Sequence, residues 1–178
     1  MALKPQKNIA DVAREIGRYS LDAFEFLHQG LDHSVQKLHG PPDPMLLKLC
    51  EWMEAKKIDP TDLERLVEAE KVPEPVADAI EHFGGPEALR QKLNRHVSGG
   101  DLCWGLRDLA LQHWGLMAPA VLRCWGIRST MDFGQMVFAL VNNGLLQKQP
   151  EDRIEDFDNV FDFDTAFDSA YKITSGSN

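Results

Sequence analysis

One histidine–carboxylate spacing in the chain could bind metal. Glu25 and His28 stand three residues apart, and Asp32 follows one helical turn later. In di-iron helical bundles, Glu-x-x-His supplies two ligands from one helix face, but a second such helix is required. No other histidine has a glutamate three residues before it. We therefore interpret these side chains as a solvated helix face and expect neither a metal nor another cofactor.

A histidine close to a serine raises the question of nucleophilic catalysis. His96 precedes Ser98 by two residues, but the chain has no Gly-x-Ser-x-Gly elbow to present a nucleophile. The glycine pairs at 84–85 and 99–100 also lack the Lys-Ser/Thr that follows a phosphate-binding loop. The sequence favours Ser98 as a helix cap.

A five-residue pattern occurs twice in the second half of the chain. Residues 103–107 read CWGLR and residues 124–128 read CWGIR. Arginine beside tryptophan, with carboxylates nearby, can form a buried ion-pair network or an anion-binding notch. Two copies fall short of a repeat architecture, so chance similarity is the first explanation of the pattern. Between the two roles we favour the ion-pair network, because charge networks are often structural. The candidate binding surface comprises His96, Arg107, Trp125, Arg128 and Asp132.

Most of the net negative charge of the chain lies in one segment, residues 151–168, which we call the acidic arm. The arm holds eight acids and one base, whereas the rest of the chain holds 20 acids and 18 bases. A calcium loop that starts at Asp156 would need glycine and glutamate at the positions of Phe161 and Phe167. The calcium-loop interpretation therefore fails.

Phenylalanine and aspartate alternate along the acidic arm. The phenylalanines occupy odd positions and the aspartates occupy even ones, a spacing that sends rings and carboxylates to opposite faces of an extended chain. We expect extended chain to about Val160, followed by a terminal helix capped by Asp162 and striped by Phe163, Ala166, Phe167, Ala170 and Tyr171. The rings should dock on the body of the protein while the acids stay in water.

Apolar residues that recur every three to four positions predict a mainly α, compact helical domain. Helices are expected near residues 8–16, 20–40, 45–56, 62–71, 75–83, 99–115, 118–125 and 130–142. We expect Gly17 to end the first helix, and we expect Ser20, Ser98 and Thr130 to cap later ones. Thr61 and Glu64 predict a capping box.

Proline and glycine clusters predict three segments within one domain. Residues 1–40 should form N-terminal helices on the core, residues 41–95 a helical insertion, and residues 96–178 a helical core with the acidic arm. The order of elements in the last segment resembles a winged helix, with three helices followed by strands at 145–148 and 154–157.

Bulk composition narrows the function classes. Three cysteines without a CxxC spacing argue against disulfides and zinc, and the absence of an export signal or a long apolar run indicates a cytoplasmic protein away from membranes. The expected helix over 130–142 contains no Lys or Arg, which argues against a nucleic-acid partner because neutralisation of phosphates supplies most of the affinity.

Three stretches of the chain resemble a known group of bacterial proteins. They are residues 17–38 (GRYSLDAFEFLHQGLDHSVQKL), residues 96–146, which include W-G-I-R-S-T-x-D-F-G, and residues 155–167 (EDFDNVFDFDTAF). They resemble an uncharacterised family of conserved hypothetical proteins from planctomycete and verrucomicrobial bacteria. The resemblance implies no activity, ligand or site residue.

Three function classes remain open at this point. The first hypothesis is a small, non-enzymatic protein-interaction module whose partner is a protein. The second is a transcriptional regulator of the winged-helix type. The third is an enzyme whose site would join His96, Arg107 and Arg128.

Overall fold

The computed structural model describes residues 7–59, 62–69 and 72–168 and confirms a mainly helical protein. The described residues contain no β-strand. The chain divides into a larger unit, residues 1–37 and 97–178, and a smaller unit, residues 38–96. That residues 41–95 are a helical insertion stays a prediction.

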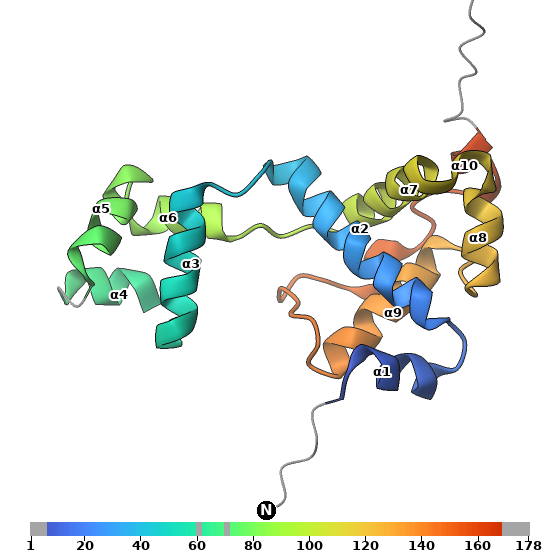
Figure 1. The fold of residues 1–178 in the computed structure, drawn as a ribbon, viewed down its shortest axis with the longest axis horizontal. Helices are drawn as coiled ribbons and strands as arrows, with labels where there is room; N and C mark the ends of the chain where they lie inside the picture. The colour runs from blue at the N-terminus through green and yellow to red at the C-terminus, as the bar shows by residue number, and fades with distance from the viewer. Residues whose placement is uncertain (1–6, 60–61, 70–71, 169–178) are drawn as a thin grey trace, which may run out of the picture. The chain divides into compact units, whose positions relative to one another are not determined.

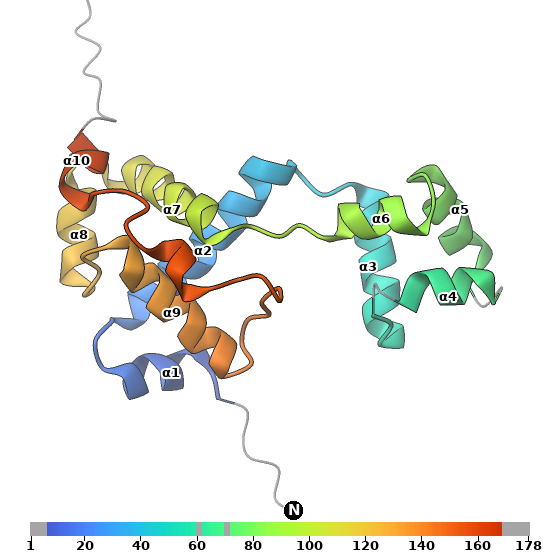
Figure 2. The same ribbon diagram turned by 180° about the vertical axis from the view of Figure 1, so that it is seen from behind.

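The larger unit combines the first helices of the chain with all of its second half (Figures 1 and 2). Its elements are α1 (Ile9–Ile16), α2 (Leu21–His39, which runs two residues past the boundary), α7 (Gly99–Trp114), η2 (Gly115–Met117), α8 (Ala118–Cys124), α9 (Thr130–Asn142), η3 (Ile154–Phe157) and α10 (Phe163–Asp168). Its largest fully buried side chains include Phe24, Leu27, Leu106, Leu122, Ile127, Phe133, Met136 and Phe167. These side chains form one core, so both ends of the described chain contribute to it.

Local capping explains where these helices start and stop. Gly17 adopts a left-handed conformation with φ 63° and ends α1, as predicted. Ser20 accepts a hydrogen bond from the Ala23 N–H at 3.2 Å, and Ser98 accepts one from the Asp101 N–H at 3.2 Å, so both predicted caps are confirmed. The prediction for Thr130 is wrong by one residue, because Ser129 is the N-cap of α9.

The smaller unit is a set of short helices with a core of its own (Figure 1). Its elements are α3 (Pro44–Lys56), α4 (Leu63–Glu68), α5 (Glu74–His82) and α6 (Pro86–Leu93). Prolines at or near the first turns of α3, α5 and α6 fit there because the N–H that proline lacks is unpaired in a first turn. The buried side chains are Leu46, Leu49, Met53, Leu63, Val76, Ile80 and Leu89. Thr61 lies outside the described residues, so the predicted capping box remains a prediction.

The winged-helix prediction is wrong, because neither expected strand is present. Residues 145–148 form bends and irregular chain, and Ile154–Phe157 form the 3₁₀ helix η3. A local hydrogen bond explains the second error, because the Asp156 carboxylate accepts from the Arg153 N–H at 2.8 Å and closes a tight turn. The segment therefore satisfies its donors locally instead of pairing with a second strand.

The acidic arm docks on the larger unit, but it is not extended. Phe157, Phe163 and Phe167 are buried and Phe161 is half-buried, so the expected burial of the rings is confirmed in the main. The predicted extended chain to Val160 is wrong, because η3 and a turn occupy that stretch. Asp162 caps α10 as expected, accepting from the Thr165 N–H at 3.0 Å. Ala170 and Tyr171 of the predicted stripe lie outside the described residues.

No helix within the described ranges is both long enough and apolar enough to cross a membrane.

Candidate interaction surface

A partly exposed tryptophan lies on the outer side of α7. Trp104 is 39% exposed although α7 packs closely on α2. The closeness follows from two glycines, because Leu106 covers Gly30 and Ser34 covers Gly105. These contacts fix the rotation of α7 about its axis and leave the indole of Trp104 facing outward.

Arg107 is held over the ring of Trp104. Its guanidinium carbon lies 4.6 Å from the ring centroid, a distance typical of a cation–π contact. The same guanidinium donates to the Asp108 carboxylate, with Nη2 at 2.5 Å and Nε at 3.0 Å from Oδ1, and Lys37 donates to the other oxygen. These hydrogen bonds outweigh the opposing effect of burial and lower the pKa of Asp108. Asp108 therefore carries a negative charge that fixes Arg107 in place.

The acidic arm supplies the other neighbour of Trp104. The rings of Trp104 and Phe161 lie 4.8 Å apart at an interplanar angle of 50°. Phe161 in turn stacks on Phe163 at 5.8 Å, and Phe163 contacts Phe167 at 5.3 Å. A line of aromatic rings thus runs from the exposed indole to the fully buried Phe167. We call Trp104, Arg107 and Phe161 the Trp104 surface.

Three further contacts hold the acidic arm in position. The Phe157 ring lies in close contact with Gly99 of α7 and Gly134 of α9. The Val160 N–H donates to the Thr130 hydroxyl at 3.3 Å. Arg123 pairs with Asp164 at 2.5 Å. The arm is therefore an integral part of the larger unit.

Several carboxylates of the acidic arm form no ion pair within the described ranges. Glu155, Asp158, Asp162 and Asp168 are exposed, and none of the four forms an ion pair with any residue that the structure describes. Asp162 is engaged as the cap of α10, and Asp158 accepts from the side-chain amide of Asn159 at 3.0 Å. These four carboxylates therefore give the acidic arm negative charge that no described cation neutralises.

Asp132 has a structural role at the start of α9. Its carboxylate is buried, with 2% exposure. One oxygen accepts from Arg18 at 2.6 Å and from the Tyr19 hydroxyl at 2.7 Å, and the other accepts from the Arg128 and Ser129 N–H groups at 2.8 and 3.0 Å. Burial, reinforced by this carboxylate, raises the pKa of Tyr19 well above its usual value. Asp132 thus ties the α1–α2 connection to α9 and has no free acceptor directed outward.

The remaining predicted site residues do not gather around Asp132. Trp125 is half-buried in an aromatic cluster, and its ring centroid lies 5.8 Å from that of Phe26 and 5.2 Å from that of Trp114. The side chain of Arg128 is exposed, and only its backbone N–H reaches Asp132. His96 belongs to the smaller unit, where its carbonyl accepts from His39 at 2.9 Å. Arg107 is therefore the one predicted site residue that forms part of the Trp104 surface.

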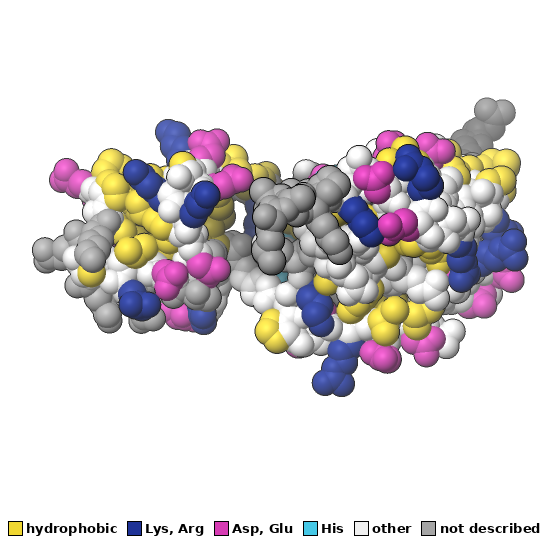
Figure 3. All heavy atoms as spheres, turned by 90° about the horizontal axis from the view of Figure 1, so that it is seen from below, with side chains coloured by type: hydrophobic (Ala, Val, Ile, Leu, Met, Phe, Trp, Pro, Cys, Tyr) yellow, Lys and Arg dark blue, Asp and Glu magenta, His cyan; other side chains and the backbone are white. Residues whose placement is uncertain are grey.

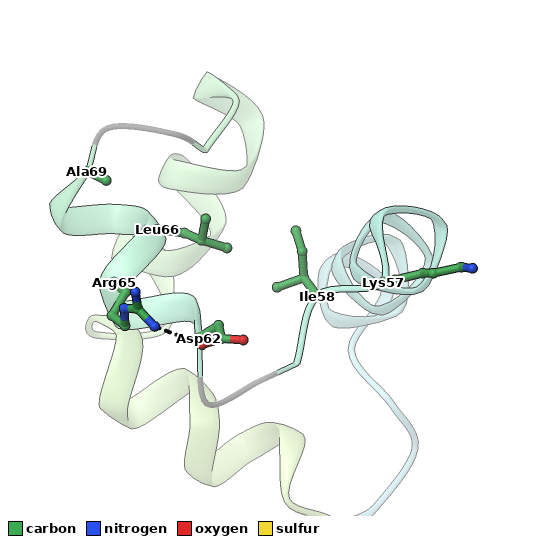
Figure 4. A pocket seen from close by; sticks show the side chains of 6 residues that line it. All are labelled: Lys57, Ile58, Asp62, Arg65, Leu66 and Ala69. Atoms are coloured by element: carbon green, nitrogen blue, oxygen red, sulfur yellow. Dashed lines mark ion pairs between the residues drawn. The ribbon is translucent and has the colours of Figure 1, made fainter.

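The smaller unit carries a shallow cavity of about 350 Å³ (Figure 4). It is lined by Lys57, Ile58, Asp62, Arg65, Leu66 and Ala69. Ile58 and Leu66 point toward one another across the gap, while Lys57 points away from it. Asp62 and Arg65 form an exposed ion pair at 3.7 Å, which contributes little to stability. Figure 3 shows hydrophobic side chains lying between charged ones on the smaller unit, at the left.

A second hollow lies in the larger unit, between α1, the start of α2 and the segment after α9. It measures about 570 Å³ and is lined by Lys7, Asn8, Ile9, Ala10, Leu21, Glu25 and Leu145. Within the described ranges, no three His, Cys, Asp or Glu side chains gather in a metal-binding arrangement.

Comparison of the chain with models of protein families, with curated proteins and with solved structures found no match. The resemblance carried by residues 17–38, 96–146 and 155–167 therefore stays a prediction.

Sequence reasoning missed the contact between Trp104 and Phe161. Trp104 belongs to the repeated CWG pattern and Phe161 to the alternating acidic arm, but nothing in either pattern connects the two. The nearest signal was the expectation that the rings of the arm dock on the body of the protein.

Proposed function

We propose that the protein is a non-enzymatic protein-interaction module that works in the cytoplasm through the Trp104 surface. The observation that carries the proposal is the position of Trp104, which is 39% exposed while its ring contacts both Arg107 and Phe161. A large aromatic ring in water costs free energy that burial against a partner would recover.

The residue types at this surface are those that dominate binding energies in measured interfaces. Tryptophan and arginine are enriched among the few residues whose truncation costs more than about 2 kcal/mol. Arg107 is already fixed by Asp108, so its side chain loses little conformational freedom on binding. The Trp104 surface is therefore preorganised for binding.

Two further features support a protein partner in a reducing compartment. The unpaired carboxylates of the acidic arm would repel the phosphates of a nucleic acid. Cys50, Cys103 and Cys124 are free thiols, which suits the cytoplasm.

The proposal can be tested by affinity capture with matched variants. The baits would be the wild-type protein and its variants Trp104→Ala and Met117→Ala. Each bait would be added to a lysate of the source organism, and the recovered proteins would be quantified by mass spectrometry. Met117 is 62% exposed on the same unit and serves as the control for loss of an exposed apolar side chain. We expect a partner that the wild-type and Met117→Ala proteins retain and that Trp104→Ala loses at least about tenfold.

Two outcomes would overturn the proposal. Equal recovery of every captured protein by all three baits would show that Trp104 contributes nothing to recognition. Loss of the same proteins with Met117→Ala would show that capture follows general stickiness. Circular dichroism and thermal melting of each bait would verify that it is folded.

A further inference from the structure

From the charges around Trp104, we infer that the partner segment recognised by this surface is basic, with lysine or arginine side chains that contact the indole and the carboxylates of the acidic arm. The inference rests on the proposed function and adds the chemistry of the partner. It depends on where the carboxylates stand, which cations already neutralise them, and how much of the ring stays open.

Carboxylates flank the Trp104 surface on the sides of both α7 and the arm. Asp101 is exposed on α7 three residues before Trp104, and residues at this spacing share a helix face. Asp156 lies next to Gly99 at the start of α7. Asp162 follows Phe161 directly in the chain. A ligand that covers the indole therefore meets negative charge along the rim.

Within the part of the chain that the structure describes, Glu155, Asp158, Asp162 and Asp168 of the acidic arm form no ion pair. Arg107 and Lys37 are both bonded to Asp108, and Arg123 is bonded to Asp164. The acidic arm has one base of its own, Arg153, against eight acids. Since like charges repel and opposite charges steer association, the arm disfavours acidic partners and favours basic ones.

The indole itself is suited to a cation. Tryptophan provides the strongest cation–π site among the aromatic side chains, and it already binds one cation, Arg107, in this way. A second cation would approach the open part of the ring, where nearby carboxylates can accept hydrogen bonds from its N–H groups. An aromatic anchor within an acidic rim therefore fits a Lys- and Arg-containing peptide better than an apolar one.

The probe for the test is a fluorescein-labelled decapeptide that alternates Lys and Arg with Ser. Its binding to the full-length protein would be followed by fluorescence anisotropy at about 0.15 M salt, where distant surface charges are screened. A decapeptide with Glu in place of Lys and Arg is the reference. We expect the basic peptide to bind and the acidic one not to bind.

Variants separate recognition by the indole from attraction by net charge. Trp104→Ala should weaken binding about fivefold to tenfold, and Trp104→Phe, which keeps an aromatic ring, should weaken it less. Met117→Ala should leave binding unchanged.

A pair of charge variants tests the carboxylates in the same way. The double variant Asp156→Asn/Asp162→Asn removes two arm carboxylates next to the Trp104 surface, and asparagine keeps the side-chain oxygens that accept from the Arg153 and Thr165 N–H groups. Its control, Asp78→Asn/Glu81→Gln, removes two exposed carboxylates from α5 of the smaller unit. We expect a loss of about threefold for the arm variant only.

Failure of this inference can be told apart from failure of the proposed function. Equal peptide binding by wild-type and Trp104→Ala proteins, or equal losses in the two charge variants, would show that binding follows net charge alone and would overturn the basic-partner inference. If capture from the lysate still depended on Trp104, the proposed function would stand with a partner of different chemistry. If capture did not depend on Trp104 either, both would fall.

Discussion

The two CWG-containing pentapeptides, residues 103–107 and 124–128, have nearly the same sequence but different structural roles. In the first copy, residues 103–107 lie in the middle of α7, and the tryptophan is exposed while the cysteine is buried. In the second copy, residues 124–128 span the end of α8, and the cysteine is exposed while the tryptophan packs in an aromatic cluster. Only the fourth residue behaves alike, since Leu106 and Ile127 are both fully buried.

The backbone causes this divergence. In α7 the pentapeptide is helical, so its side chains spread around the helix axis at 100° intervals. In the second copy Gly126 adopts φ 91° and turns the chain out of the helix. The same residue types therefore face different surroundings, and the comparison teaches that a short repeated sequence does not specify a repeated role.

The largest expected difference between the copies concerns the tryptophans. Trp125→Ala should lower the free energy of unfolding by about 3 kcal/mol because it leaves a cavity beside Phe26 and Trp114. Trp104→Ala should cost less than about 1 kcal/mol because the ring is already partly in water. Urea denaturation measures both values, and equal losses would contradict the division of roles.

The glycines offer the next contrast. Gly126→Ala should cost about 2 kcal/mol, because its φ is positive and its new Cβ would lie 2.3 Å from the carbonyl oxygen of Arg18. In Gly105→Ala the Cβ would instead meet the side chain of Ser34.

A second substitution distinguishes the two glycine positions. Ser34→Gly should partly restore the thermal stability of Gly105→Ala, since it removes the obstructing atoms. No side-chain truncation should restore Gly126→Ala, because the obstruction there is backbone. Rescue of the Gly126 variant by Ser34→Gly would count against this account.

The fold was predictable where the signal was local. Three-to-four-residue periodicity correctly indicated a helical protein, and the caps at Ser20 and Ser98 followed from side-chain chemistry. The winged-helix hairpin failed because Ile154–Phe157 looked like a short strand, whereas the Asp156 carboxylate closes it as a 3₁₀ turn. A short apolar run in a sequence does not distinguish a short strand from a 3₁₀ turn.

The candidate surface was less predictable because its parts are distant in sequence. Arg107 was identified, but the pairing of Trp104 with Phe161 depends on how the acidic arm crosses α7. The partners of Asp132 are equally distant, since Arg18 and Tyr19 come from the first connection in the chain. Neither contact has a periodic signature, so only the tertiary structure could reveal them.

A smaller effect concerns the dependence of stability on pH. In the first copy Arg107 is followed by the titratable Asp108, whereas in the second copy Arg128 is followed by Ser129. The pKa of Asp108 is lowered by its partners Lys37 and Arg107, so its contribution to stability is present above its unfolded value near 4 and is lost as pH falls through the folded value. Asp108→Asn should therefore show a shallower loss of melting temperature than wild type on acidification below about pH 4.

The control for this titration is Asp168→Asn, an exposed position at the end of α10. Its acid profile should run parallel to that of the wild type. Parallel profiles for Asp108→Asn and wild type would show that the contacts between Arg107, Lys37 and Asp108 contribute nothing to folding.

The smallest effect involves no change in stability at all. Burial raises the pKa of Cys103 to about 12 and removes the thiol from solvent, whereas Cys124 is exposed. Iodoacetamide should therefore alkylate Cys124 in the native protein and reach Cys103 only after denaturation. Peptide mass spectrometry measures both, and early alkylation of Cys103 would show that α7 opens readily.

The discontinuity of the larger unit has a consequence for biosynthesis. Residues 1–37 emerge from the ribosome first, but the α7 and α9 side chains that they pack against lie beyond residue 97. The smaller unit has its own core and can fold while residues 38–96 are synthesised. During that time the apolar stripe of α2 is exposed, because α7 and α9 have not yet been made. Slow translation of residues 38–96 would prolong that exposure, so the nascent chain, more than the finished protein, is the form that benefits from a chaperone.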